Sequence, residues 1–178
     1  MCANPRLVTE VGSIAGGEPL CLDQKDKHVK IRIACQNDIE SIKECINSAY
    51  KHYEVRLGIK PGPMLADYKK SIENDKTYVA EDVVLGIIGV LILVESEKKF
   101  LLENIAIHPS VQGRGYGKEL LQFAEKTAQE FGFAYVELYT HKKMNENIIL
   151  YQQIGYEIFN YVYENGYNRV YMRKLVKG

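Results

Sequence analysis

The strongest constraint on the fold of this sequence is a change of hydrophobic period near the middle of the chain. Three runs rich in apolar and β-branched residues are separated by short turns, the pattern of an antiparallel meander, and they cover residues 77–81, 85–95 and 100–107. Pro109 ends the third run, and a glycine-rich stretch follows at 112–117. Residues 117–131 then take up a helical period. The chain must therefore place a glycine loop between a sheet and a helix.

The helix predicted over 117–131 is amphipathic, and Gly132 is well placed to cap its C-terminus. Its expected core face consists of Leu120, Leu121, Ala124, Ala128 and Phe131.

The segment before the meander predicts one strand and two helices. Residues 29–34 alternate apolar and polar side chains, as a half-buried strand does. Asn37 or Asp38 can cap the helix that follows. Pro61-Gly62-Pro63 then breaks the chain before a second, shorter helix at 64–74. The expected apolar face of the first helix consists of Ile39, Ile42, Cys45, Ile46 and Ala49.

The segment after the central helix predicts a strand at 134–140 and a helix at 145–154 that Gly155 closes. Two final strands, at 156–164 and 167–175, turn at Asn165-Gly166, which is a strong hairpin signal. The predicted order is β-α-α-β-β-β-α-β-α-β-β, an α/β (α+β) chain. We expect one domain over 29–178, preceded by a loosely ordered extension at 1–28, because that extension has no periodicity.

Composition excludes several classes of function. The chain has 23 basic and 23 acidic residues, so it lacks the global positive field on which non-specific nucleic-acid binding depends. No apolar stretch approaches the ~20 residues that span a bilayer, and residues 1–28 do not read as a signal peptide. Cys2, Cys21, Cys35 and Cys45 form no C-x-x-C pair, which predicts no metal site and free thiols in a reducing cytoplasm.

The glycine loop predicts an anion site, because main-chain N–H groups at a helix start are unpaired and the helix dipole adds positive potential. Gly113, Gly115 and Gly117 allow close approach of a phosphate, while Arg114 and Lys118 add charge at the rim. Two nucleotide motifs fail here. A phosphate-binding P-loop needs Ser or Thr where Glu119 stands and Gly where Gln112 stands, and a dinucleotide fingerprint needs Gly where Lys118 stands.

The segment 102–117, LENIAIHPSVQGRGYG, resembles the central motif of the GNAT acetyltransferases. Its Q-x-x-G-x-G core is Gln112, Gly115 and Gly117. A second family motif, N-x-x-x-L-Y-x-x-x-G-[FY], resembles Asn147 (one residue closer), Leu150, Tyr151, Gly155 and Tyr156. The resemblance covers about residues 29–175. It implies the GNAT fold, a mixed central sheet of about 7 strands flanked by about 4 helices.

The resemblance also implies acetyl-CoA as co-substrate, with the loop around its pyrophosphate and the preceding strand along its pantetheine arm. A main-chain N–H on that strand, at 104–107, would bind the oxyanion. Asn147 would bind the pantetheine arm, although Asn145 lies close enough to take that part. The implied cofactor-binding residues are Ile105, Ala106, Ile107, Gln112, Gly113, Arg114, Gly115, Tyr116, Gly117, Lys118, Asn147 and Tyr151.

Acetyl transfer to an amine needs a base for the amine and an acid for the departing thiolate. The resemblance implies Tyr151 as the acid, because a phenol stays protonated at neutral pH. It implies Glu103 or Glu137 as the base. Strand alternation would place Glu103 with Ile105 on one face and Asn104 on the other. Candidates for the acceptor wall are Tyr50, Tyr53, Tyr68, Tyr139 and His141.

The sequence therefore predicts an N-acetyltransferase that transfers directly from acetyl-CoA to a primary amine, in the cytoplasm, with a possible homodimer by resemblance. Two alternatives stay open: acetylation of a protein or peptide, and a non-catalytic acyl-CoA sensor. Glu95, Glu97 and Glu103 hint weakly at a cationic acceptor.

Overall fold

The computed structural model describes residues 29–176. The expectation for residues 1–28 lies outside this part of the chain, as do Cys2 and Cys21. The described elements are β1 (Val29–Ile33), α1 (Ile39–Leu57), α2 (Tyr68–Asn74), β2 (Lys76–Asp82), β3 (Gly86–Glu95), β4 (Phe100–Ile107), α3 (Tyr116–Glu130), β5 (Tyr135–His141), α4 (Asn145–Gln153), β6 (Glu157–Glu164) and β7 (Tyr167–Leu175). Their order is the predicted one.

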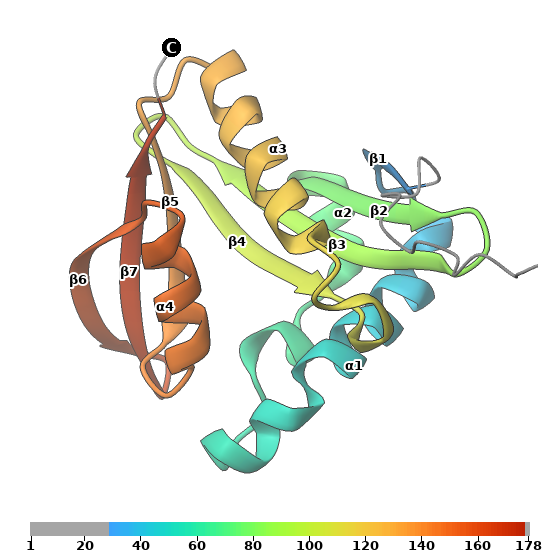
Figure 1. Ribbon diagram of the computed structural model, residues 1–178, viewed down its shortest axis with the longest axis horizontal. Coiled ribbons are helices and arrows are strands. Elements are labelled where there is room, and N and C mark those ends of the chain that lie inside the picture. Colours follow the sequence, from blue (N-terminus) through green and yellow to red (C-terminus); the bar gives the residue numbers. More distant parts are fainter. Residues whose placement is uncertain (1–28, 177–178) are drawn as a thin grey trace, which may run out of the picture.

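The seven strands form one mixed sheet in the order β1-β2-β3-β4-β5-β7-β6 (Figure 1). The meander β2-β3-β4 is antiparallel, as its short turns predict. Asn165 and Gly166 both have positive φ, 51° and 81°, which fits the predicted two-residue hairpin turn between β6 and β7. Only β4 and β5 pair in parallel within the described sheet, because α3 carries the chain between them.

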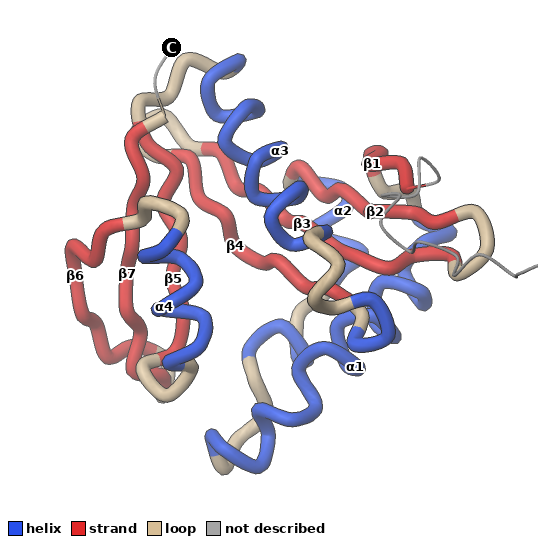
Figure 2. The backbone as a smooth tube through the Cα atoms, viewed as in Figure 1, coloured by secondary structure: helices blue, strands red, loops and turns tan. Residues whose placement is uncertain are grey.

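Helices cover both faces of the sheet (Figure 2): α3 and α4 on one face, α1 and α2 on the other. The predicted core positions of α3, from Leu120 to Ala128, are buried. Phe131 was expected there too, but it is 48% exposed because the helix ends at Glu130 and Gly132 (φ 79°) turns the chain away. On α1 the predicted positions Ile42, Cys45, Ile46 and Ala49 are buried as well.

Two local expectations before β2 are corrected. Asp38 occupies the N-cap of α1 but makes no side-chain cap bond there; its carboxylate instead accepts from the Cys35 N–H (2.8 Å) and pairs with Arg32 (2.7 Å). The predicted helix at 64–74 begins later, at Tyr68, because Gly62–Leu65 forms a 3-10 turn and Ala66 is extended. Asp67 caps this shorter helix by accepting from the Lys70 N–H.

The sheet is split beside β4. The parallel ladder between β4 and β5 covers only the pairs Phe100↔Val136, Leu101↔Glu137 and Leu102↔Leu138. Beyond Leu102 the two strands diverge (Figure 1), so the β5-facing edge of β4 over residues 103–107 is not paired with β5. No helix within 29–176 has the length and apolar character to cross a membrane.

Candidate active site

Two connected hollows lie along the unpaired edge of β4. The larger is a groove of about 420 Å³ between the glycine loop, α1 and α4, and we call it the loop groove. The smaller has a volume of about 90 Å³ and lies between β4, β5, β7 and the segment after α1; we call it the tyrosine pocket. The residues that line both hollows are Tyr50, Ile105, Asn147 and Tyr151. These four residues mark the junction.

The glycine loop forms one wall of the loop groove through main-chain geometry. Gly113 and Gly115 have φ of 80° and 93°, in the left-handed region that side-chain-bearing residues avoid. Gly115 is the N-cap of α3, so the first N–H groups of that helix lie at the end of the loop. The Gln112 side-chain amide donates to the Ile107 carbonyl (3.0 Å), which ties the loop to the end of β4.

Most of the cofactor-binding residues predicted from the sequence come together in the loop groove. Those that line it are Ile105, Ala106, Ile107, Gln112, Gly113, Tyr116, Gly117, Lys118, Asn147 and Tyr151. Arg114 and Gly115 are not among the lining residues. Helix α1 completes the opposite wall with Ala49, Tyr50, His52 and Tyr53, none of which is among the predicted cofactor-binding residues. Tyr50 and Tyr53, which the sequence predicts only for the acceptor wall, therefore line the loop groove as well.

Helix α4 brings Asn147 and Tyr151 to the junction one turn apart. The Asn147 Oδ1 accepts from the Tyr53 hydroxyl (3.3 Å), which ties α4 to α1 across the groove. Asn145, the alternative to Asn147, is exposed and lines neither hollow. Tyr151 is only 7% exposed, and burial raises the pKa of its phenol above the ordinary value. Tyr151 therefore remains protonated well above neutral pH.

A β-bulge places Glu103 on the wall of the tyrosine pocket. Ile92 pairs with Asn104 and Leu93 with Leu102, so Glu103 is an extra residue in β4. The bulge reverses the expected alternation. Ile105 packs into the core under α3, whereas Glu103 turns to the Tyr139 side of the sheet, so the expectation that the two share a face is wrong.

Glu103 and Tyr139 form one polar unit in this pocket. The Tyr139 hydroxyl donates to the Glu103 Oε1 at 2.6 Å. Burial, and secondarily the Glu103 carboxylate, raise the pKa of Tyr139, so Tyr139 keeps its proton and acts as the donor. Glu137 lies two residues before Tyr139 on β5, opposite Arg173 of β7, and lines neither hollow. Of the two predicted glutamates, only Glu103 reaches the site.

Arg169 on β7 supplies a cation to the same pocket. Its guanidinium carbon lies 3.9 Å from the centre of the Tyr139 ring, and its Nη1 contacts the Glu164 Oε1 at 3.1 Å. The Tyr171 hydroxyl donates to that same carboxylate oxygen. Arg169 was not among the predicted site residues, because the RVYMRK stretch that begins with it resembles the family's terminal strand without indicating that this side chain reaches a pocket.

The remaining wall of the tyrosine pocket comes from the segment after α1. Leu57, Pro61, Gly62 and Pro63 line it, and the Tyr167 hydroxyl donates to the Lys60 carbonyl (2.8 Å), which bridges β7 to this segment. His141 also lines the pocket, and burial lowers its pKa. Tyr68, another acceptor candidate, instead lies in the core against α1, where it is 3% exposed and donates to the Pro63 carbonyl.

Cysteine and metal chemistry have no visible place in the described site. Cys35 and Cys45 line neither hollow, and burial raises the pKa of the Cys45 thiol to about 12. Within residues 29–176, no group of three or more His, Cys, Asp or Glu side chains is arranged to hold a metal ion.

Comparison with known proteins agrees with this arrangement. A model of the acetyltransferase (GNAT) domain matches residues 73–158, a range that contains the glycine loop and α4. The uncharacterized N-acetyltransferase YjgM of Escherichia coli K12 is 33% identical over 82 residues, 46% of this chain and 49% of YjgM. The match thus spans about half the length of that curated relative.

Solved structures extend the likeness to nearly the whole described fold. An IAA acetyltransferase from Bacillus cereus is 25% identical with a TM-score of 0.61, over 83% of this chain and 99% of that one. The PaiA N-acetyltransferase of Thermoplasma acidophilum, solved with coenzyme A, is 20% identical with a TM-score of 0.65, over 83% and 98%. At this level of sequence identity, the similarity between PaiA and this chain shows a shared fold. Taken with the split sheet and the glycine loop, these matches identify a GNAT acetyltransferase domain over residues 73–158 and support membership of the chain in the GNAT family.

Proposed function

We propose that this protein is an N-acetyltransferase that moves an acetyl group from acetyl-CoA to the primary amine of a small molecule by direct transfer. The observation that carries the proposal is the junction of the two hollows at Tyr151. A donor in the loop groove and an acceptor in the tyrosine pocket would meet there. Both would contact one buried, protonated phenol.

The loop groove fits the shape and charge of acetyl-CoA. Its anion-binding end is the start of α3, where N–H groups and Lys118 offer positive charge to a pyrophosphate. Its other wall is the unpaired edge of β4, which offers main-chain groups to an extended amide-bearing arm. Asn147 lies where that arm would approach the junction. The coenzyme A bound to PaiA, a relative in fold, supports this assignment.

The chain's own side chains account for the proton transfers. Bound acetyl-CoA supplies a thioester carbonyl as the electrophile. Glu103 accepts the proton that the acceptor amine loses, directly or through a water, while Tyr139 holds its carboxylate in place. Main-chain N–H groups on the unpaired edge of β4 stabilise the negative charge that develops on the carbonyl oxygen. As the carbon–sulfur bond breaks, Tyr151 donates its proton to the sulfur.

The tyrosine pocket favours a small acceptor over a protein chain. Its volume is about 90 Å³, far below the 420 Å³ of the loop groove, and the hydrogen bond from Tyr167 to the Lys60 carbonyl joins β7 to the segment that forms the outer wall. The described cysteines favour direct transfer over an acetyl-cysteine intermediate, because neither lines the two hollows. A reducing cytoplasm, where acetyl-CoA is made available to such enzymes, is the compartment we propose.

The edge of the sheet supports the expected homodimer. Strand β6 ends the sheet, and Phe159, Tyr161 and Tyr163 on it are 41%, 64% and 72% exposed. We propose that β6 pairs with a second copy. Light scattering should give twice the mass of one chain, and Tyr161→Asp should return it to one chain.

The experiment for the main proposal is a free-thiol release assay with acetyl-CoA and a panel of amino acids, polyamines, aminoglycosides and peptides. We expect thiol release with at least one small amine and loss of that turnover in Tyr151→Phe. If acetyl-CoA binds but no member of the panel causes thiol release, the proposed enzyme activity is wrong and the alternative function, a non-catalytic acyl-CoA sensor, takes its place.

A further inference from the structure

We propose that the amine acceptor is a free amino acid with an uncharged side chain, and that Arg169 binds its carboxylate while Glu103 receives its amine. This inference rests on the proposed acetyl transfer and names the class of acceptor.

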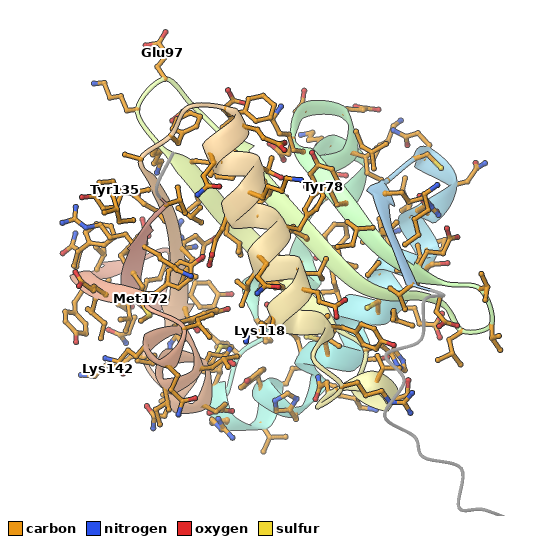
Figure 3. All side chains as sticks on the ribbon, turned by 45° about the horizontal axis from the view of Figure 1, so that its top comes forward. Tyr78, Glu97, Lys118, Tyr135, Lys142 and Met172 are labelled. Carbon is orange, nitrogen blue, oxygen red and sulfur yellow. The ribbon has the colours of Figure 1, made fainter. Side chains whose placement is uncertain are left out.

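The charges that line the tyrosine pocket suit a zwitterion. Among the described lining residues there is one carboxylate, Glu103, and one guanidinium, Arg169. A polyamine or an aminoglycoside carries several cations and would need several carboxylates. Glu95 and Glu97, which hinted at such an acceptor, do not line this pocket. Glu95 pairs with Lys76 (3.3 Å), and Glu97 projects from the β3–β4 turn, far from Lys118 at the groove (Figure 3).

The spacing of the two charges suits an amino acid. Tyr139 lies between them: its hydroxyl donates to Glu103 (2.6 Å), and its ring lies beneath the Arg169 guanidinium (3.9 Å). The guanidinium therefore lies over the face of the ring and the carboxylate at its hydroxyl end, so one tyrosine side chain separates the two charges. An amine and a carboxylate on one carbon atom, each with its own hydrogen bond, span a similar distance.

Arg169 keeps donors for a ligand. A guanidinium has five N–H donors, and Glu164 contacts only Nη1 among the pairs that the structure gives. The Glu164 oxygen is also shared with the Tyr171 hydroxyl. The Arg169 side chain is 21% exposed, so an ion pair formed there is partly shielded from water. A planar guanidinium in this setting favours the two oxygens of a carboxylate.

The other lining groups set the expected side chain of the acceptor. Leu57, Pro61, Pro63 and Met144 are apolar and line the same pocket. They would contact an aliphatic, thioether or aromatic side chain. A second charge on the acceptor would have no partner among these residues and would lose its hydration.

The test compares each amino acid with the amine that lacks only its carboxylate: L-leucine with 3-methylbutylamine, L-methionine with 3-(methylthio)propylamine, and L-phenylalanine with 2-phenylethylamine. Thiol release gives kcat/KM for both members of a pair. We expect the wild type to prefer at least one amino acid over its partner by 10-fold or more. In Arg169→Met we expect that ratio to fall at least 10-fold, because only the amino acid loses a carboxylate contact, whereas the lost contacts with Glu164 and Tyr139 affect both members of a pair alike.

Two variants separate ligand binding from a structural role. Arg169→Lys keeps the charge without the planar fork and should give an intermediate ratio. Glu164→Gln removes the ion-pair partner of Arg169 and should leave the ratio unchanged or higher. If Arg169→Met lowers kcat/KM equally for both members of every pair, Arg169 is a structural brace and the inference is overturned.

The failure of this inference differs from failure of the proposed function. Turnover of amines with no preference for a carboxylate overturns the inference and leaves the acetyltransferase in place. Absence of thiol release with every amine, while acetyl-CoA still binds, overturns both.

Discussion

The loop groove and the tyrosine pocket meet at the same four residues but are built in different ways. The loop groove takes more than half of its lining from one stretch of chain, residues 105–121, and much of its character from main-chain conformation. The tyrosine pocket takes side chains from α1, the segment after it, β4, β5, α4 and β7. The donor side is thus encoded locally, whereas the acceptor side depends on the convergence of distant side chains. Single substitutions should therefore be able to change acetyl-CoA binding without changing amine binding, and the reverse.

The largest effect is expected from Gly113→Val. Gly113 has φ of 80°, which a β-branched residue strongly disfavours, and the new side chain would stand at the loop groove. We expect acetyl-CoA to bind about 100-fold more weakly, in line with strain and crowding of roughly 2–3 kcal/mol together. Calorimetric titration measures this. Gly86→Val is the matched control, because Gly86 has φ of 74° and lies outside both hollows; equal loss of binding in both variants would contradict a local role for Gly113.

An effect of similar size is expected at the junction, from Tyr151→Phe. The variant keeps the buried ring and loses the proton donor, so kcat should fall about 100-fold while acetyl-CoA affinity stays within about threefold. Because burial raises the Tyr151 pKa, the wild type should show no loss of kcat from this group up to pH 10. Tyr156→Phe is the control: its ring lies 5.8 Å from that of Tyr151 but lines neither hollow, so its kcat should not change.

A smaller effect confined to the tyrosine pocket is expected from Tyr167→Phe. This variant loses one hydrogen bond to the Lys60 carbonyl, worth about 1 kcal/mol. The KM for the amine should rise about fivefold while the affinity for acetyl-CoA does not change. A shift of equal size in both would show that the hollows are not built independently.

The smallest effect on function is expected from Asp38→Asn, which lies outside both hollows. Contact with Arg32 holds the Asp38 pKa at about 2, below its ordinary value of 3.8. The native state therefore gains stability above pH 4, and this gain is lost as pH falls towards 2. We expect Asp38→Asn to lower the free energy of unfolding by about 1–2 kcal/mol at pH 7 and by much less at pH 2. Denaturant titration at both pH values measures this, and ligand binding at pH 7 should not change.

The same contrast explains what the sequence could predict. Hydrophobic period and turn chemistry are local, so the order of the elements, the α3 core face and the Asn165-Gly166 turn follow from the residues themselves. Errors arose where tertiary contacts decide: Phe131 fits the helical period but lies past the end of α3, and Tyr68 packs into the core.

The same distinction between local motifs and tertiary contacts holds for the site residues. The glycine loop and α4 have recognisable motifs, and most of their residues line the loop groove. The turn of Glu103 towards Tyr139 depends on a bulge that only the register with β3 reveals. Arg169 comes to the pocket through the pairing of β7 with β5, which local sequence does not reveal.

Initial-rate kinetics with acetyl-CoA and the best amine of the panel, both varied, test the central claim most directly. Two ligands that meet at Tyr151 must be bound together before transfer, so the double-reciprocal lines should intersect. Parallel lines, together with an acetylated protein detected by mass spectrometry without amine, would contradict direct transfer at this junction.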